Sequence, residues 1–237
     1  MIKSSSLRVV VLADGRRPSR EGLDAAWPGW DAGIELVVAA DGGALLAESL
    51  GLRIDRWVGD GDSVGVEGLA KIRAAGIPIA LAAADKDETD TEMAILDAIE
   101  AGAGDITILG ALGGSRIDHV LANIALLGHP AIAQAGVSIR ILDPAARIVL
   151  LTAPEREGGP ARLELGGPFP GLVSLIPFGG DVAGVTTEGL RYPLHDEALS
   201  LGVPRGISNV REGPAASVTI RSGRLLIVET PATLFGT

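Results

Sequence analysis

Short apolar runs alternate with helical patterns through the first 150 residues, and this alternation constrains the fold more than any other feature of the sequence. Six runs lack the polar alternation of a half-exposed strand, which is typical of parallel strands covered on both faces: residues 8–12, 35–39, 56–58, 78–81, 106–109 and 137–142. Apolar residues at helical spacing predict helices between them, over residues 44–50, 66–75, 90–101 and 117–127. This order is typical of an α/β fold with a doubly wound, mostly parallel, Rossmann-like sheet.

A change in composition near residue 152 predicts a domain boundary. The segment 153–160 is rich in proline, glycine and charge, as turns and linkers are. Short predicted strands follow at 162–165, 172–177, 216–221 and 225–230. The last two flank Ser222-Gly223-Arg224, which predicts a terminal hairpin. We therefore expect an α/β domain over residues 1–152 and a smaller all-β sandwich or barrel over residues 160–237.

The composition of the chain limits its partners. The net charge is −10, from 30 acidic and 20 basic residues, and a field of that sign repels nucleic acid and anionic membranes. The absence of cysteine excludes disulfides, thiolate zinc sites and cysteine nucleophiles. The longest uncharged stretch, residues 120–139, contains Asn123, Gly128 and Pro130, which favour a helix and a turn over a membrane span. We expect a cytoplasmic protein that binds neither nucleic acid nor membrane.

Aspartates recur directly after the predicted strands. In open α/β sheets, ligands bind at the carboxyl ends of the strands, and all of these loops would lie at that edge. Any one loop alone favours a structural role, because aspartate and glycine are ordinary turn residues. Carboxylates crowded together repel one another unless a hard cation lies among them, and oxygen ligands suit Mg²⁺. The loops are Asp41-Gly42-Gly43, Gly59-Asp60-Gly61-Asp62-Ser63, Asp85-Lys86-Asp87-Glu88-Thr89-Asp90 and 110–119.

The last of these loops indicates a phosphate-bearing substrate. Gly113 and Gly114 would let the backbone approach a polyphosphate closely, and Arg116 offers a forked, permanently charged donor. The loop matches neither the glycine pattern of dinucleotide sites nor that of P-loops. His119 and Asn123 lie four residues apart on one face of the predicted helix, which either faces the site or bonds to nearby backbone.

Taken together with Ser208-Asn209, these loops occur in the order and spacing of thiamine pyrophosphokinases, and the chain resembles that family from Val9 to Glu229. The resemblance implies that a pyrophosphoryl group passes from ATP to the hydroxyl of thiamine, with Mg²⁺ as cofactor, giving thiamine diphosphate and AMP. It also implies an α/β catalytic domain, a β-sandwich, and a homodimer with its active site at the subunit junction.

The resemblance also implies roles for individual residues. The magnesium ligands would be Asp60, Asp62 and Asp90, and Asp41 and Asp87 would complete the catalytic carboxylates. Nucleotide contacts would come from Lys86, Thr89, Gly113, Gly114, Ser115, Arg116, Asp118 and His119. Thiamine contacts would come from Tyr192, Ser208 and Asn209. Thiamine is a cation, so a carboxylate-rich site with a nearby aromatic face suits it.

The sequence departs from the family pattern at three places, and two other functions remain open. Gly61 stands where a bulky residue is common, Tyr192 stands where tryptophan is common, and the first loop reads Asp14-Gly15-Arg16-Arg17-Pro18. One alternative is a pyrophosphokinase for another hydroxymethyl heterocycle, such as a pterin. The other is a vitamin or nucleotide sensor without catalysis, although a pure binder has no need of clustered charge.

Overall fold

A computed structural model describes residues 7–81, 87–154 and 159–232 of the chain. It divides into two compact units, one formed by Met1–Asp24 and Pro28–Asp143, the other by Ala25–Trp27 and Pro144–Thr237. This division falls earlier than the domain boundary predicted near residue 152. The difference arises because strand β7 (Ala146–Thr152) pairs with β14 (Arg224–Pro231), so it belongs to the second unit.

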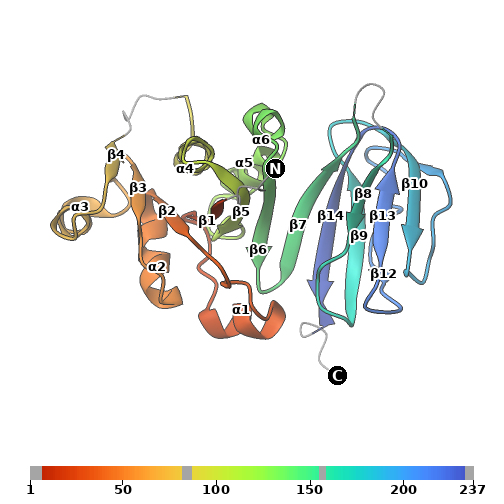
Figure 1. Cartoon of the computed structure of the whole chain (residues 1–237), viewed down its shortest axis with the longest axis horizontal. Coiled ribbons are helices and arrows are strands. Elements are labelled where there is room, and N and C mark those ends of the chain that lie inside the picture. Colours follow the sequence, from red (N-terminus) through yellow and green to blue (C-terminus); the bar gives the residue numbers. More distant parts are fainter. Residues whose placement is uncertain (1–6, 82–86, 155–158, 233–237) are drawn as a thin grey trace, which may run out of the picture. The chain divides into compact units, whose positions relative to one another are not determined.

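The first unit contains the predicted parallel sheet. Its strands run in the order β6 (Ser138–Asp143), β5 (Ala103–Leu109), β1 (Leu7–Leu12), β2 (Leu36–Ala40), β3 (Arg56–Gly59) and β4 (Ile79–Leu81), as Figure 1 shows. Every pairing among them is parallel. Val9, Val11 and Leu12 of the central strand are completely buried, as expected for a strand covered on both faces. The carboxyl ends of all six strands therefore share one edge of the sheet.

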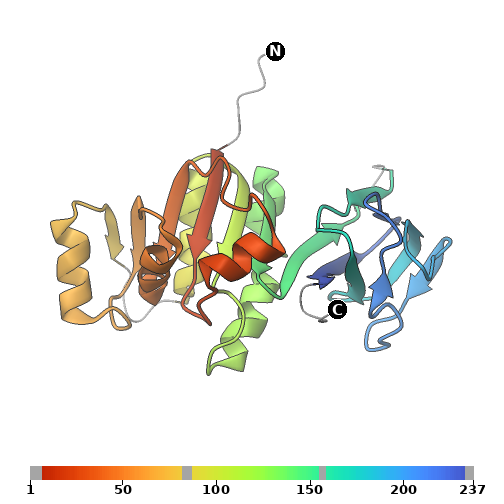
Figure 2. The same ribbon diagram turned by 90° about the horizontal axis from the view of Figure 1, so that it is seen from below.

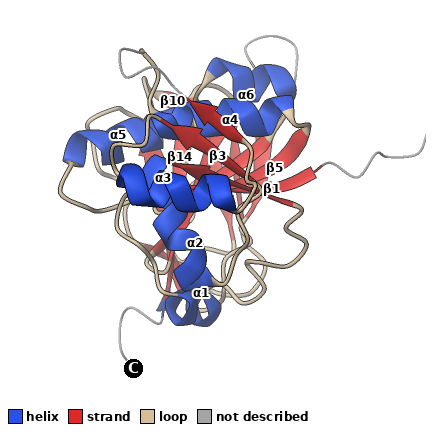
Figure 3. Cartoon of the chain, turned by 90° about the vertical axis from the view of Figure 1, so that its left-hand side faces the viewer, coloured by secondary structure: helices blue, strands red, loops and turns tan. Residues whose placement is uncertain are grey.

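Among the described residues, six helices accompany this sheet. They are α1 (Arg20–Ala26), α2 (Ala44–Leu50), α3 (Gly65–Ala74), α4 (Asp90–Glu100), α5 (Ile117–Leu126) and α6 (Pro130–Ala135). In Figure 3, α4 and α6 lie on one side of the strands, and α1 and α2 lie on the other side. This is the doubly wound arrangement. Helices α2 to α5 lie where the sequence predicts them, whereas α1 and α6 were not predicted. Among the described residues, no helix is both long and apolar enough to cross a membrane.

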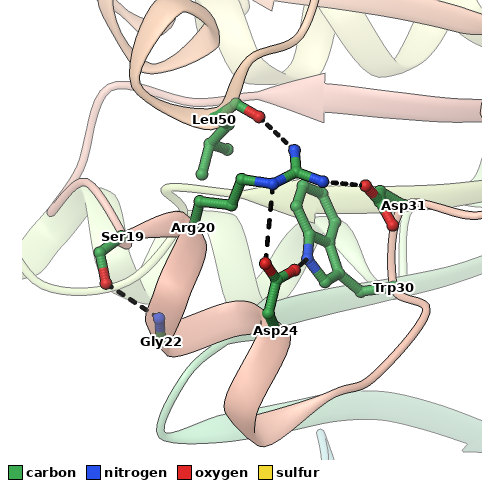
Figure 4. A network of polar contacts seen from close by, with 7 residues as sticks. All are labelled: Ser19, Arg20, Gly22, Asp24, Trp30, Asp31 and Leu50. Carbon is green, nitrogen blue, oxygen red and sulfur yellow. Dashed lines mark hydrogen bonds and ion pairs between the residues drawn. The ribbon is translucent and has the colours of Figure 1, made fainter.

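An arginine fixes the position of α1. The guanidinium of Arg20 bonds to the Leu50 carbonyl at the end of α2, pairs with Asp24 and Asp31, and lies 5.6 Å from the ring centroid of Trp30, as Figure 4 shows. Trp30 in turn donates from Nε1 to Asp24 at 2.8 Å. The cation therefore satisfies a carbonyl at a helix C-terminus, where positive charge is favourable.

In the second unit, the described strands form two groups, and every pairing within each group is antiparallel. One has the order β12 (Asn209–Val210), β9 (Gly171–Pro177), β14 and β7, and the other has β11 (Glu197–Leu199), β10 (Val182–Glu188), β13 (Ser217–Ile220) and β8 (Ala161–Glu164). Figure 2 shows these strands in the green-blue to blue part of the chain. Side chains from both sheets, including Val173, Leu175, Val218 and Ile227, form one buried cluster. This packing is that of a β-sandwich.

The predicted terminal hairpin is wrong. β13 pairs with β10 and β8, whereas β14 pairs with β7 and β9, so the two strands belong to different sheets. Gly223, between them, has φ +89°, and a Cβ there would lie 2.6 Å from the Asp181 carbonyl oxygen. The turn therefore carries the chain from one sheet to the other, close against the start of β10.

Candidate active site

The tight turn after β2 places an aspartate inside the protein. Asp41 begins a 3-10 turn (Asp41–Gly43), has the left-handed φ of 42° and is only 4% exposed. Aspartate and asparagine tolerate this backbone region better than most residues. The Asp41 carbonyl accepts a hydrogen bond of 3.0 Å from Nε1 of the buried Trp57. The turn is therefore held from β3 as well as from β2.

Two glycines let this turn pack against the end of β1. A Cβ on Gly43 would lie 2.0 Å from the Leu12 carbonyl oxygen, and one on Gly42 would lie 2.2 Å from the Asp14 carboxylate. Contacts that short do not occur between real atoms, so a side chain at position 43 must displace the backbone at the end of β1, whereas one at position 42 must displace the exposed Asp14 carboxylate. The Asp-Gly-Gly sequence is thus explained by steric need as well as by chemistry.

Replacing Gly43 with alanine tests that packing directly. Its φ of −56° is helical and suits alanine, so the expected loss comes from the contact with Leu12 alone. We expect Gly43→Ala to lower the free energy of unfolding by about 1–3 kcal/mol, the usual cost of overpacking. Thermal unfolding followed by circular dichroism measures it. Gly213→Ala is the control, because a Cβ there meets nothing within 4 Å; equal stability of the two variants would contradict the account.

Three carboxylates meet at the ends of β2 and β3. Asp41, Asp60 and Asp62 each offer one oxygen, and these oxygens lie within 4.8 Å of one another. Backbone amides orient them, because Asp62 N–H donates to Asp60 Oδ1 at 3.1 Å and Ser63 N–H donates to Asp41 Oδ2 at 3.3 Å. Asp41 Oδ1 is buried and has no hydrogen-bond partner among the described residues. A buried carboxylate that has an unsatisfied oxygen and is grouped with two more carboxylates fits a hard divalent cation.

The family resemblance implied a trio that differs in one member. It expected Asp60, Asp62 and Asp90 as metal ligands and Asp41 as a further catalytic carboxylate, whereas the described group contains Asp41. Asp90 is the first residue of α4 and lines a cleft together with Asp41, Asp60 and Asp62. Its carboxylate lies in the first helical turn, where the helix dipole favours negative charge.

A cleft of about 420 Å³ collects most of the predicted site residues at this edge. Its lining includes Asp41, Asp60, Asp62, Thr89, Asp90, Gly113, Gly114, Ser115, Arg116 and His119. Asp87 and Asp118 are exposed and are not part of this lining, and Lys86 lies outside the described residues. Asp14, Gly15, Ser63 and Glu88 also line the cleft, although the sequence assigned them no role in the site, and so does Asn123, for which a place in the site was one of two alternatives.

Thr89 is the N-cap residue of α4 and so places Asp90. Its Oγ1 accepts the backbone N–H of Glu92 at 3.1 Å, which is an N-cap bond. The Thr89 hydroxyl proton remains available, because the oxygen is the acceptor in that bond. The threonine therefore serves the helix and can still donate into the cleft.

The glycine-rich loop after β5 is fastened through its carbonyl groups. The N–H groups of Gly15 and Arg16 donate to the carbonyls of Gly110 and Leu112 at 2.7 and 3.0 Å. The buried Asn123 of α5 donates from Nδ2 to the Ala111 carbonyl at 2.9 Å. The Asn123 side chain thus bonds to nearby backbone while it lines the cleft, so both alternatives for this helix face hold.

Gly113 and Gly114 continue this loop in the left-handed backbone region, with φ of 69° and 89°. Arg116 and Asp118 follow and form an exposed pair, with Nε to Oδ1 at 2.9 Å and Nη2 to Oδ2 at 2.5 Å. Hydrogen bonding from Arg116 lowers the pKa of the Asp118 carboxyl to about 2, so both groups are charged at neutral pH. Asp118 therefore orients the guanidinium that lines the cleft.

The predicted thiamine contacts lie next to one another in the second unit. Tyr192 is 64% exposed, and Ser208 is exposed with a left-handed φ of 60°. Asn209 is buried, and its side-chain amide bonds to both the N–H and the carbonyl of Tyr192. The spacing of these residues in the sequence carries no signal for that contact.

Comparisons with known proteins match both units. The profile of the thiamin pyrophosphokinase catalytic domain matches residues 31–141, and that of the thiamin pyrophosphokinase vitamin B1 binding domain matches residues 163–225. The chain is 28% identical over 204 residues to thiamine pyrophosphokinase of Bacillus subtilis, covering 86% of each protein. It is 30% identical over 211 residues to thiamine pyrophosphokinase 1 of Oryza sativa, covering 80% of this chain and 76% of the relative. The crystal structure of thiamin pyrophosphokinase from Geobacillus thermodenitrificans superposes with a TM-score of 0.75 at 27% identity, covering 94% of this chain and 97% of that one.

Proposed function

The chain belongs to the thiamin pyrophosphokinase family, and on that premise we propose that it transfers the pyrophosphoryl group of ATP to the hydroxyl of thiamine, giving thiamine diphosphate and AMP. The observation that carries the proposal is the single cleft at the carboxyl edge of the sheet. It combines three converging carboxylates with a glycine-rich loop and an arginine, which are the groups that phosphoryl-type transfer requires.

Mg²⁺ is the proposed cofactor, and Asp41, Asp60 and Asp62 would hold it, with Asp90 as a further ligand. The unsatisfied Asp41 Oδ1 and the 4.8 Å grouping support this choice. Their all-oxygen chemistry matches the ligands that Mg²⁺ prefers. When bound, the ion neutralises charge on the phosphate oxygens.

The remaining side chains of the cleft would bind and orient the polyphosphate. Backbone N–H groups at Gly113, Gly114 and Ser115 can approach its oxygens closely, and Arg116, held by Asp118, donates from a fixed fork. The thiamine hydroxyl oxygen loses its proton to water and forms a bond to the β-phosphorus, while the bond from that phosphorus to the α,β-bridging oxygen breaks and AMP leaves with the bridging oxygen. Catalysis then comes mainly from position and charge neutralisation.

The nucleotide roles of Lys86, Thr89 and His119, and the catalytic role of Asp87, stay proposals of the same kind. Thr89 and His119 line the cleft. For thiamine, the exposed ring of Tyr192 and the hydroxyl of Ser208 are the proposed contacts in the second unit. An aromatic face attracts a cationic heterocycle.

We also propose that the protein is a homodimer with its active site at the subunit junction. Apolar side chains left exposed in each unit support an interface between two copies. On α5, Ile117 and Leu121 are 71% and 62% exposed, and in the second unit Leu201 and Val203 are exposed. Sedimentation velocity is expected to give twice the 24.1 kDa chain mass, and a monomer at micromolar concentration would contradict the dimer.

A panel of acceptors tests the proposed substrate. AMP release from ATP and Mg²⁺ is measured with thiamine, with a hydroxymethylpterin, and without acceptor. We expect release that depends on thiamine and stays at the acceptor-free rate with the pterin. Release with the pterin but not with thiamine would indicate that the acceptor is another hydroxymethyl heterocycle. Equal release without any acceptor would indicate simple hydrolysis of ATP.

A further inference from the structure

The side-chain amide of Asn209 is almost fully used inside the second unit. Its Oδ1 accepts the N–H groups of Tyr192 at 3.0 Å and Val210 at 2.9 Å, and its Nδ2 donates to the Tyr192 carbonyl at 2.7 Å. An asparagine amide offers two acceptor positions and two donor hydrogens, so three of its four bonds are made here. The residue is also only 8% exposed. Little of it is left to bind a ligand.

The amide bonds a residue that the backbone ladder itself would leave unpaired. The segment through Leu190 runs antiparallel to the one through Arg211, and Arg191 N–H donates to the Val210 carbonyl at 2.9 Å. In this register Tyr192 lies opposite Asn209, and because hydrogen-bonded and non-hydrogen-bonded pairs alternate, the N–H and carbonyl of Tyr192 point away from the neighbouring backbone. The side-chain amide of Asn209 bonds both of these groups.

Tyr192 is thereby fixed at its backbone while its ring stays in solvent. Tyr192 is 64% exposed, and the following residue, Pro193, has no N–H with which to continue the pairing. Leu194 is held separately, because its N–H donates to Thr187 Oγ1 at 2.9 Å. The two bonds from Asn209 therefore hold the Tyr192 backbone in place, and with it the Cα atom from which the ring extends.

We propose that Asn209 acts in acceptor binding through Tyr192, as a positioning residue that presents the ring to a cationic aromatic heterocycle, rather than by touching that ligand itself. The inference rests on the proposed function, in which Tyr192 faces thiamine, and it revises the expected direct contact of Asn209. Holding the ring in its bound position lowers the ordering cost of binding. Loss of the amide then weakens acceptor binding and leaves nucleotide binding unchanged.

Tyr192 is the only tyrosine of the chain, so labelling with 3-fluorotyrosine gives one ¹⁹F resonance that reports on it alone. In the free protein, we expect Asn209→Ala to shift or broaden this resonance. Thr187→Val is the matched control, because it removes another buried side-chain bond to the same loop and should leave the resonance in place. An unchanged resonance in Asn209→Ala overturns the proposal. This measurement needs neither substrate nor turnover, so it stands apart from the proposed function.

A double-mutant cycle then separates positioning from contact. We expect Asn209→Ala to raise the KM for thiamine about 3- to 10-fold, the size of a lost cation–ring contact, with the KM for ATP unchanged. In a Tyr192→Ala background the same change should add less than about twofold, because the two residues act as one unit. A full additional effect in that background means direct contact and overturns the proposal. Asn209→Asp, which keeps the acceptor and loses the donor, gives an intermediate result and covers the case in which Asn209→Ala does not fold.

Discussion

Replacing Asp62 with asparagine is expected to lower kcat at least about 100-fold, the size of effect seen when one preorganised charge-stabilising group is removed. Asp62 is exposed at the end of β3, and its contact with the Ser63 hydroxyl can be kept by an amide oxygen. The fold should therefore survive while the charge of the carboxylate group falls. The rate of AMP release with thiamine measures the loss, and circular dichroism checks the fold.

The same variant distinguishes an enzyme from a sensor. Asp181→Asn is the control, because Asp181 is exposed in the second unit, accepts a backbone bond from Leu201, and can keep that bond as asparagine. We expect it to retain the wild-type rate. A wild-type rate in Asp62→Asn would contradict the proposed site. A wild-type protein that binds thiamine without turnover, with binding unaltered in the variant, would instead indicate a sensor.

Replacing Asp41 with asparagine is expected to abolish activity and yet stabilise the metal-free protein. Asp41 is buried with an unsatisfied oxygen, within 4.8 Å of two other carboxylates, so neutralising it removes like-charge repulsion of order 1 kcal/mol. Asparagine also tolerates the left-handed φ of 42°. In EDTA we expect the Tm to rise by about 2–4 °C.

Magnesium should stabilise the wild type and have little effect on the stability of Asp41→Asn. An ion that binds only the folded state raises the Tm of the wild type, and Asp41→Asn should lose most of that rise together with its turnover. Asp181→Asn again serves as the control and should respond to Mg²⁺ as the wild type does. A variant that is no more stable in EDTA and still responds fully to Mg²⁺ would show that Asp41 is not part of a cation site.

The sequence predicted the first unit well because its signals are local. Buried parallel strands are short uninterrupted apolar runs, so each predicted strand overlaps an observed one, and the loops after them had to share an edge. Helix α6 was missed although its signals are present: His129 caps it, Pro130 stands at its first position and Gly136 ends it with φ 66°. Those residues favoured a turn when the sequence was considered alone.

The second unit and the finer site were less predictable because they depend on contacts distant in the chain. Alternating strands do not reveal which sheet they join, so the turn at Gly223 resembled a hairpin. The Asn209 bonds span 17 residues, and no local pattern marks them. Likewise, Asp41 joins the carboxylate group because its backbone is left-handed. The glycines after it allow this turn, but they do not predict it from the sequence.

Phosphorus NMR of the purified protein with ATP, Mg²⁺ and thiamine, beside a sample without thiamine, tests the central claim most directly. Pyrophosphoryl transfer predicts AMP and thiamine diphosphate in equal amounts, only when thiamine is present. ADP with thiamine monophosphate would show transfer of a single phosphoryl group and contradict the proposed attack at the β-phosphorus. The absence of any thiamine-dependent product would contradict thiamine as the acceptor.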